Sequence, residues 1–281
     1  MSQVSASILV DKIKELIIQA NTILRPDIFE ALKEAQKAET HPNGQKILGM
    51  LIENASLAKE ESKPICQDTG YVDVYFQWPS QVSLRSDLQE IVNEAVKQSY
   101  KEKPFRHSMV ADPLYERKNT SDNTPANIIV KPAKGRELVV KVLVKGAGSD
   151  NSSTVFMLNP SSSSRELVKV VVDHVKAYAA KSCPPLVVGI GIGGSFGKVA
   201  ALSKAALFRN INEANIDVRY GELEKEILSK INDLGIGPSG LGGKTTALSV
   251  MIEQAPCHMA SLPVAVNLNC YALRTAEAII G

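Results

Sequence analysis

The feature that most constrains the fold is a strand–helix pair in the C-terminal half of the chain. Residues 185–192 (PLVVGIGI) form a continuous apolar run, which is typical of a buried strand. Residues 195–209 (SFGKVAALSKAALFR) follow and have the composition of a long helix. Most of the apolar mass is Ile, Leu, Val and Ala, and aromatic residues make up only 5% of the chain. These observations predict an α/β protein.

The N-terminal part of the chain is predicted to be mainly helical. Five apolar residues recur there on one face at helical spacing: Leu9, Ile13, Leu16, Ile17 and Ala20. Two further helices are expected, one after Pro26 and one over residues 44–57. No internal repeat and no domain boundary is evident. We therefore predict a single domain over residues 1–281, in which a helical segment (1–62) packs on a mixed α/β body (63–281).

The body is expected to alternate between strands and helices. The expected strands cover residues 72–76, 127–130, 137–144, 185–192 and 261–268. The expected helices cover residues 83–101, 165–181, 195–209 and 222–234. Residues 103–126 are rich in Pro, Asn and Thr and show no periodicity, so they predict an irregular segment.

Charge and hydropathy exclude several classes of protein. The 32 basic and 30 acidic residues are interspersed, and no basic cluster predicts a nucleic-acid partner. No apolar run approaches the length of a membrane-spanning helix. Asp11, Lys12 and Lys14 stand where a signal peptide would be apolar. We predict a cytoplasmic protein whose partners are neither nucleic acid nor membrane.

Two glycine-rich segments resemble nucleotide-binding loops but lack the rest of the pattern. Gly189, Gly191 and Gly194 match G-x-G-x-x-G, yet no second strand ending in an acidic residue follows about 20 residues on. Their alternatives are an anion site at the helix N-terminus or close strand–helix packing. Gly243 begins a G-K-T triplet, but Pro238 occupies the position that a phosphate loop gives to glycine and has no amide to donate.

The cysteines carry the most informative chemistry. Cys66 is followed by the polar run QDTG, Cys183 precedes two prolines, and Cys270 follows a strand near the start of an expected helix. Thiols in loops and at element ends are placed as metal ligands often are, although buried packing is the common alternative. Three thiolates can hold three irons of a [4Fe–4S] cluster, and the remaining iron is then free as a Lewis acid for a 2-hydroxy acid.

Several long motifs together resemble the N-terminal domain of class I (iron–sulfur) fumarate hydratases. They are ICQDTG, the Phe105–Arg106 pair before VADPL, NTPANI, CPPLVVGIGIGG, GIGPSGLGGKTTAL and HMASLPVAVNLNC. The resemblance implies a hydro-lyase of the tricarboxylic acid cycle that hydrates fumarate to L-malate. It also implies a [4Fe–4S] cluster ligated by Cys66, Cys183 and Cys270, with one iron that has no cysteine ligand. Because the family places the third ligand at Cys270, Cys257, beside His258, is interpreted as a buried packing residue.

The same resemblance assigns the other site residues. It makes Gln67, Arg106, Gly148 and His258 substrate contacts and Asp68 the catalytic acid. Three alternatives stay open, because Asp68 can simply cap a turn, His107 can be the ligand instead of Arg106, and His258 can be the acid. The glycine loop is KGAGS where the family usually has KGGGS, which leaves open whether Ala147 or Gly148 presents its amide to the ligand.

Two other functions remain as alternatives to fumarate hydratase. L(+)-tartrate dehydratase alpha subunits resemble the chain, but GIGG, LGGKTT and ASLPVAVN follow the fumarase versions of these segments. A non-enzymatic iron–sulfur redox sensor or scaffold would not need Gln67, Asp68, Arg106 and His258 as a set.

The family's smaller C-terminal domain has no counterpart here, since the sequence ends soon after Cys270. The resemblance therefore implies a separate beta subunit, in an α2β2 heterotetramer.

Overall fold

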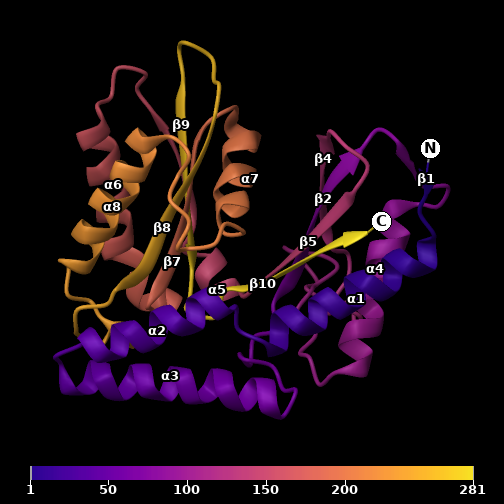
Figure 1. Cartoon of the computed structure of the whole chain (residues 1–281), viewed down its shortest axis with the longest axis horizontal. Helices are drawn as coiled ribbons and strands as arrows, with labels where there is room; N and C mark the ends of the chain where they lie inside the picture. Colours follow the sequence, from indigo (N-terminus) through magenta and orange to yellow (C-terminus); the bar gives the residue numbers. More distant parts are fainter. Residues whose placement is uncertain (1, 281) are drawn as a thin grey trace. The chain divides into compact units, whose positions relative to one another are not determined.

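The computed structural model describes residues 2–280, which divide into two compact units. Unit 1 consists of residues 2–25, 55–147 and 274–280, and unit 2 of residues 26–54 and 148–273. Each unit contains its own four-stranded mixed sheet and its own apolar core. The fold is thus mixed α/β with a helical N-terminal segment, as predicted (Figure 1). The expectation of a single domain over the whole chain stays a prediction.

Unit 1 is a mixed sheet covered by two helices. Its sheet has the order β10-β5-β2-β4, in which β2 and β4 are parallel and the other neighbours antiparallel. The bounds of its strands are β1 Ser2–Gln3, β2 Tyr71–Pro79, β3 Val82–Ser83, β4 Asn127–Ala133, β5 Leu138–Lys145 and β10 Arg274–Ile280. Helices α1 (Ala6–Thr22) and α4 (Leu88–Glu102) pack together, and α1 lies on β5 and β10.

The apolar face of α1 explains this packing. All five residues that the sequence places on one face of this helix are buried: Leu9, Ile13, Leu16, Ile17 and Ala20. They join one core with Val74 of β2 and Val142 of β5. Each fully buried Leu, Ile or Val removes enough apolar surface from water to contribute about 1.5–3 kcal/mol. The α3 helix (Pro42–Glu60) begins in unit 2 and ends in unit 1.

Unit 2 is a sheet covered on both faces. Its order is β6-β9-β7-β8, with only β7 and β8 parallel. The strands are β6 Thr154–Leu158, β7 Leu186–Gly193, β8 Ala247–Ala255 and β9 Leu262–Asn269. The helical elements are α2 Pro26–Ala38, α5 Ala147–Asp150, α6 Ser164–Tyr178, η1 Ala179–Ser182, α7 Phe196–Ala206, α8 Val218–Asn232 and η2 Pro238–Gly240. Helices α6 and α8 lie on one side of the sheet and α7 on the other (Figure 1).

This arrangement accounts for the apolar run that the sequence shows. Every residue of β7 is buried, because helices cover both faces of a central strand. The sequence analysis did not predict β6, which is only five residues long, or β8, in which polar side chains interrupt the apolar pattern. The helix expected near Cys270 is wrong: the segment after it leads into β10, which pairs antiparallel with β5 along its whole length. Backbone pairing to β5 overrides the helical propensity of RTAEA.

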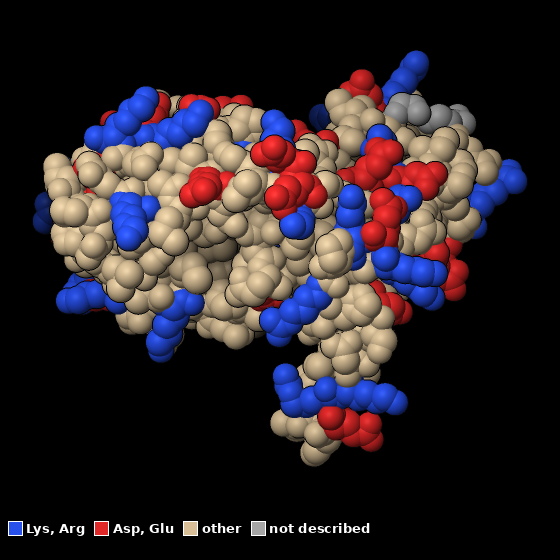
Figure 2. Space-filling view, turned by 90° about the horizontal axis from the view of Figure 1, so that it is seen from below, with Lys and Arg blue, Asp and Glu red and all other residues tan. Residues whose placement is uncertain are grey.

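Two surface properties complete the description. On the face shown in Figure 2, basic and acidic side chains are interspersed. No helix within residues 2–280 is long and apolar enough to cross a membrane.

Candidate functional site

The first cysteine motif lies in unit 1, in the segment that joins α3 to β2. The Cys66 thiol is half-buried and donates to the Gln67 amide oxygen at 3.3 Å. Both oxygens of the Asp68 carboxylate accept main-chain N–H bonds, Oδ1 from Gly70 (3.0 Å) and Oδ2 from Ala147 (2.9 Å). Asp68 therefore caps its own turn and also fastens this turn to the loop that follows β5.

Thr69 brings the predicted carboxylate-binding arginine to this segment. Its hydroxyl accepts from the main-chain N–H of Arg106 at 2.8 Å and donates to the Arg106 carbonyl at 3.0 Å. The Arg106 backbone is thus fixed while its side chain remains exposed. His107 instead packs its ring 6.0 Å from that of Tyr100. Of the two candidates, Arg106 is the one whose position leaves it free for a ligand.

Two buried residues that sequence analysis did not identify form hydrogen bonds with the main chain of the same segment. The Tyr100 hydroxyl donates to the carbonyls of Thr69 (2.6 Å) and Gly70 (3.0 Å). Burial raises the pKa of Tyr100 above its usual 10.0, although the nearby Arg274 charge opposes this, so the hydroxyl keeps its proton. The Asn123 amide also donates to Gly70 and accepts from the Ser108 N–H at 2.7 Å. For Asn123, the only signal in the sequence was that it is part of the NTPANI motif.

The other two predicted cluster cysteines lie at one end of the unit 2 sheet. Cys183 is exposed and has a left-handed backbone (φ 53°, ψ 67°) directly after η1. It precedes β7, whose Val187 pairs with Asn269 of the antiparallel β9, and Cys270 follows Asn269. The two thiols therefore belong to the same sheet end, where η1 also contacts β9.

Gly148 lies near the main chain that leads to Cys183. A Cβ built on it would be 3.8 Å from the Lys181 carbonyl, two residues before Cys183. Ala147, the other candidate for presenting an amide, already donates its N–H to Asp68. Gly148 therefore stays the predicted substrate contact.

His258 is at the opposite end of that sheet. It lies in the turn between β8 and β9, whereas Cys270 follows β9, an eight-residue strand that spans roughly 25 Å. Its ring is exposed and Nδ1 accepts from the Ala260 N–H at 3.1 Å, so Nε2 carries the proton of a neutral ring and can donate. The structure does not bring His258 to the cysteines of its own unit.

The interpretation of Cys257 as a buried packing residue is wrong. Its side chain is exposed in the turn after β8, and its thiol lies 3.3 Å from the Ser261 carbonyl. The strand ends at Ala255, so the residues that follow leave the core and run over the surface.

The free thiols of the cysteines are chemically suitable as ligands of an iron–sulfur cluster. Within residues 2–280 none of the four forms a disulfide; Cys66 lies in a loop and Cys183 and Cys270 at element ends, all with exposed or half-buried side chains. Cys66 belongs to unit 1, and Cys183 and Cys270 to unit 2. In neither unit does the described part of the chain gather three His, Cys, Asp or Glu side chains into a metal-binding group. Thiols at such positions are suited to coordinate iron.

The glycines of β7 serve packing. A Cβ on Gly189 would collide with the Ser203 carbonyl of α7, and one on Gly191 with the Val199 carbonyl. The close strand–helix approach that the sequence analysis offered as an alternative is therefore confirmed, because any side chain here would push α7 from the sheet.

The second glycine loop is closed by a carboxylate from the same unit. Glu39, which is 1% exposed, accepts at Oε1 from the N–H groups of Thr40 and His41, both at 3.0 Å. Its Oε2 accepts from Lys244 at 2.8 Å and Thr245 at 3.4 Å. Burial raises the pKa of Glu39, but these four N–H bonds outweigh it and hold the pKa below 4.5. The amides that suggested a phosphate loop are thus already satisfied.

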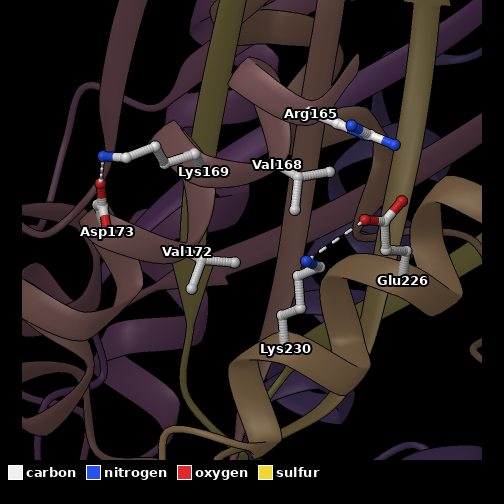
Figure 3. Close-up of a pocket in the computed structure, with 7 residues that line it drawn as sticks. All are labelled: Arg165, Val168, Lys169, Val172, Asp173, Glu226 and Lys230. Atoms are coloured by element: carbon white, nitrogen blue, oxygen red, sulfur yellow. Dashed lines mark hydrogen bonds and ion pairs between the residues drawn. The ribbon is translucent and has the colours of Figure 1, made fainter. Parts of the chain in front are cut away.

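A groove of about 340 Å³ lies between α6 and α8, and its lining includes none of the predicted site residues (Figure 3). Its lining is Arg165, Val168, Lys169, Val172, Asp173, Glu226 and Lys230. Both lysines are paired within their own helices, Lys169 with Asp173 at 2.6 Å and Lys230 with Glu226 at 3.6 Å. Such surface pairs contribute little energy and do not define a ligand site.

The mixed α/β fold and the Cys66-Gln67-Asp68 motif fit the class of iron–sulfur hydro-lyase subunits, and comparison with known proteins agrees. The sequence model of the family described as "Fumarate hydratase (Fumerase)" matches residues 10–279. The "Putative L(+)-tartrate dehydratase subunit alpha" of Methanocaldococcus jannaschii is 40% identical over 272 residues, 95% of each chain. The "L(+)-tartrate dehydratase subunit alpha" of Escherichia coli K12 is 30% identical over 290 residues, 100% of this chain and 94% of the relative. The chain therefore belongs to the fumarase and tartrate dehydratase family of iron–sulfur hydro-lyases, among its alpha subunits.

Proposed function

We propose that the chain is the alpha subunit of a [4Fe–4S]-dependent hydro-lyase that removes water from L(+)-tartrate. The observation that carries this proposal is its full-length identity to relatives with that name. In the reaction a C–O bond breaks on one carbon and a C–H bond on its neighbour. Water leaves, and the resulting enol rearranges to oxaloacetate.

Reversible hydration of fumarate to L-malate is the second candidate. The description of the matching family names this reaction, and the segments GIGG and LGGKTT resemble the fumarase versions. Both candidates eliminate water from neighbouring carbons of a four-carbon 2-hydroxy dicarboxylate, so the same residues can serve either one. They differ in the second hydroxyl, which only tartrate carries.

The proposed ligands of the cluster are Cys66, Cys183 and Cys270. When bound, the cluster supplies a Lewis acid at the iron that has no cysteine ligand. Family membership, and the fact that none of the three thiols forms a disulfide, support this assignment.

The proposed roles of the polar residues follow from their positions. The exposed Arg106 guanidinium matches a carboxylate bidentately, on a backbone that Thr69 fixes. Gln67, also exposed, orients the substrate by its amide. Asp68 transfers a proton to the leaving hydroxyl group. The Gly148 amide faces the substrate.

The complete enzyme is proposed to be an α2β2 heterotetramer. The names of the relatives as alpha subunits support a separate beta chain. His258 lies at the far end of the unit 2 sheet from Cys183 and Cys270. We therefore assign its substrate contact to the site of a second alpha chain, which a symmetric assembly permits.

The test is a comparison of substrates with the alpha and beta chains co-expressed without oxygen. L(+)-tartrate and L-malate are compared by kcat/KM, with D-tartrate as the stereochemical control. A site built around the second hydroxyl should prefer L(+)-tartrate over malate by about 10⁴-fold. Preference for malate would overturn the tartrate assignment in favour of fumarase. Turnover of neither, with a cluster that only changes redox state, would favour the sensor.

A further inference from the structure

Arg274 is a buried cation to which the roles proposed above give no part. Its side chain is 2% exposed and is the largest of the fully buried side chains in the described part of the chain. Its Nε has no hydrogen-bond partner within residues 2–280. Burying a guanidinium with an unsatisfied donor costs free energy, and a well-packed apolar side chain of similar size would avoid that cost. The hydrogen bonds that the guanidinium does form can offset this cost.

Arg274 binds directly to the first cysteine motif. Its Nη1 donates to the main-chain carbonyl of Asp68 at 2.6 Å and to the Asn21 amide oxygen at 3.2 Å. Asn21 is itself buried near the end of α1, and its main-chain carbonyl accepts from the Ile65 N–H at 2.8 Å. The arginine and the asparagine therefore bracket the segment from Ile65 to Asp68, which contains Cys66.

The Asp68 side chain extends this connection to the loop after β5. It accepts from the Gly70 and Ala147 amides. The loop passes so close that a Cβ on Gly146 would lie 3.1 Å from Asp68 Oδ2 and 3.2 Å from Arg274 Nη2. If the main-chain carbonyl of Asp68 loses its donor, the Asp68 carboxylate should be held less firmly within hydrogen-bond distance of the Gly70 and Ala147 amides.

We propose that Arg274 is a positioning residue that fixes the Cys66–Asp68 segment through the main-chain carbonyl of Asp68. Its importance to the reaction rests on the proposed function, in which this segment supplies a cluster ligand and the acid. The hydrogen bonds themselves do not depend on it.

The test uses the full chain without a cluster and follows amide hydrogen exchange. Arg274→Met keeps the volume but removes every donor, so exchange at Gly70 and Ala147 should rise about tenfold, as expected for loss of a charge-assisted hydrogen bond. Exchange at Val74, in the middle of β2, should stay unchanged. Alkylation of Cys66 should accelerate while that of the exposed Cys257 does not.

Three further variants keep the outcome clear. Arg274→Lys should restore part of the protection, because it can still donate to one acceptor. Asn21→Ala should loosen the same segment if Arg274→Met fails to fold. Arg25→Met is the matched control, since Arg25 Nη1 donates at 3.2 Å to the hydroxyl of Thr275, the neighbour of Arg274. It should leave Gly70 and Ala147 protected.

The results separate this proposal from the proposed function. Unchanged exchange at Gly70 and Ala147 in both Arg274→Met and Asn21→Ala would overturn the positioning role. An equal rise throughout β2 would show a general loss of stability and would also overturn it. A selective rise in a chain that never yields an active hydro-lyase with its beta partner would leave the positioning role intact and refute the function.

Discussion

Asp68 uses both carboxylate oxygens to hold main-chain amides, and this affects how its role is tested. A protonated carboxyl has one acceptor fewer for the Gly70 and Ala147 N–H groups. Donating a proton to substrate and holding the turn are therefore linked functions of one side chain. A variant at this position alters the hydrogen bonds as well as the chemistry.

We expect Asp68→Asn to lower kcat by about 10²–10⁴-fold, because an amide has no carboxyl proton to donate. The measurement is kcat and KM without oxygen, normalised to cluster content. The normalisation is needed because the amide nitrogen of the variant side chain can face the Ala147 N–H, two donors in contact, and so disturb the turn. Gln67→Ala is the control and should mainly raise KM, because an amide orients substrate without exchanging protons. If Asp68→Asn keeps more than about a tenth of kcat, the acid is another group.

The cysteines give a second test at the scale of single residues. Cys66→Ser, Cys183→Ser and Cys270→Ser should each lose iron and activity, because each removes a thiolate ligand. Cys257→Ser should keep both, and it is a matched control for Cys183 because both thiols are exposed in unit 2. Iron and sulfide are counted after anaerobic reconstitution. Full iron content in Cys183→Ser would disprove the ligand assignment.

At the scale of elements, buried carboxylates and glycines set the distances between segments. Gly189 and Gly191 let α7 approach β7 until backbone meets backbone. Glu39, just beyond the end of α2, gathers amides from its own turn and from the loop before β8. These contacts hold loops in place without contributing to the proposed chemistry.

Glu39→Gln should lower the free energy of unfolding by about 1–3 kcal/mol at neutral pH, because an amide nitrogen would face two N–H donors. The folded pKa of Glu39 lies below 4.5, so its contribution is complete above that value and is lost as pH falls through the folded pKa. The difference between the wild type and Glu39→Gln should therefore shrink in acid. Urea unfolding followed by circular dichroism measures it. Glu34→Gln, at an exposed position on α2, is the control and should show neither effect.

At the scale of the whole molecule, the proposed enzyme needs more than one chain. The substrate contact proposed for His258 requires a second alpha chain, and the alpha names of the relatives imply a beta chain. Each requirement can be tested separately.

Cys183→Ser and His258→Ala should complement each other when co-expressed with the beta chain. In a mixed assembly one site receives an intact cysteine set from one alpha chain and an intact histidine from the other. About a quarter of the wild-type activity should return if the chains mix at random in a two-fold assembly. Each variant alone should be far less active. No recovery, from mixed assemblies shown to form, would place His258 in the site of its own chain or outside the site.

The alpha chain purified alone should be inactive with both tartrate and malate, and adding the beta chain should restore turnover. The physical reason is that, among the described alpha-chain residues assigned to the site, Arg106 alone carries a permanent positive charge, whereas the substrate has two carboxylates. Activity is assayed with reconstituted cluster, and purity is checked by mass spectrometry. High activity from a preparation free of beta chain would contradict the requirement.

The sequence by itself determined the class of fold, the family and the short-range geometry. The apolar face of α1 and the run in β7 predicted buried elements, because helical periodicity and continuous hydrophobicity follow directly from residue order. The cysteine and QDTG motifs predicted the family, which the comparisons confirm. Pro238 argued against a phosphate loop, and in the structure Glu39 accepts from the Lys244 and Thr245 amides of this segment.

Which distant segments meet became known from the three-dimensional structure. The pairing of β10 with β5 replaced an expected helix, because a strand's stability depends on its neighbour and not on its own propensity. The bonds of Thr69 to Arg106, and of Arg274 to Asp68, join residues that no local pattern links. The exposure of Cys257 and the distance of His258 from Cys270 follow from where β8 and β9 end. Such contacts depend on long-range packing, which residue order specifies only through the completed fold.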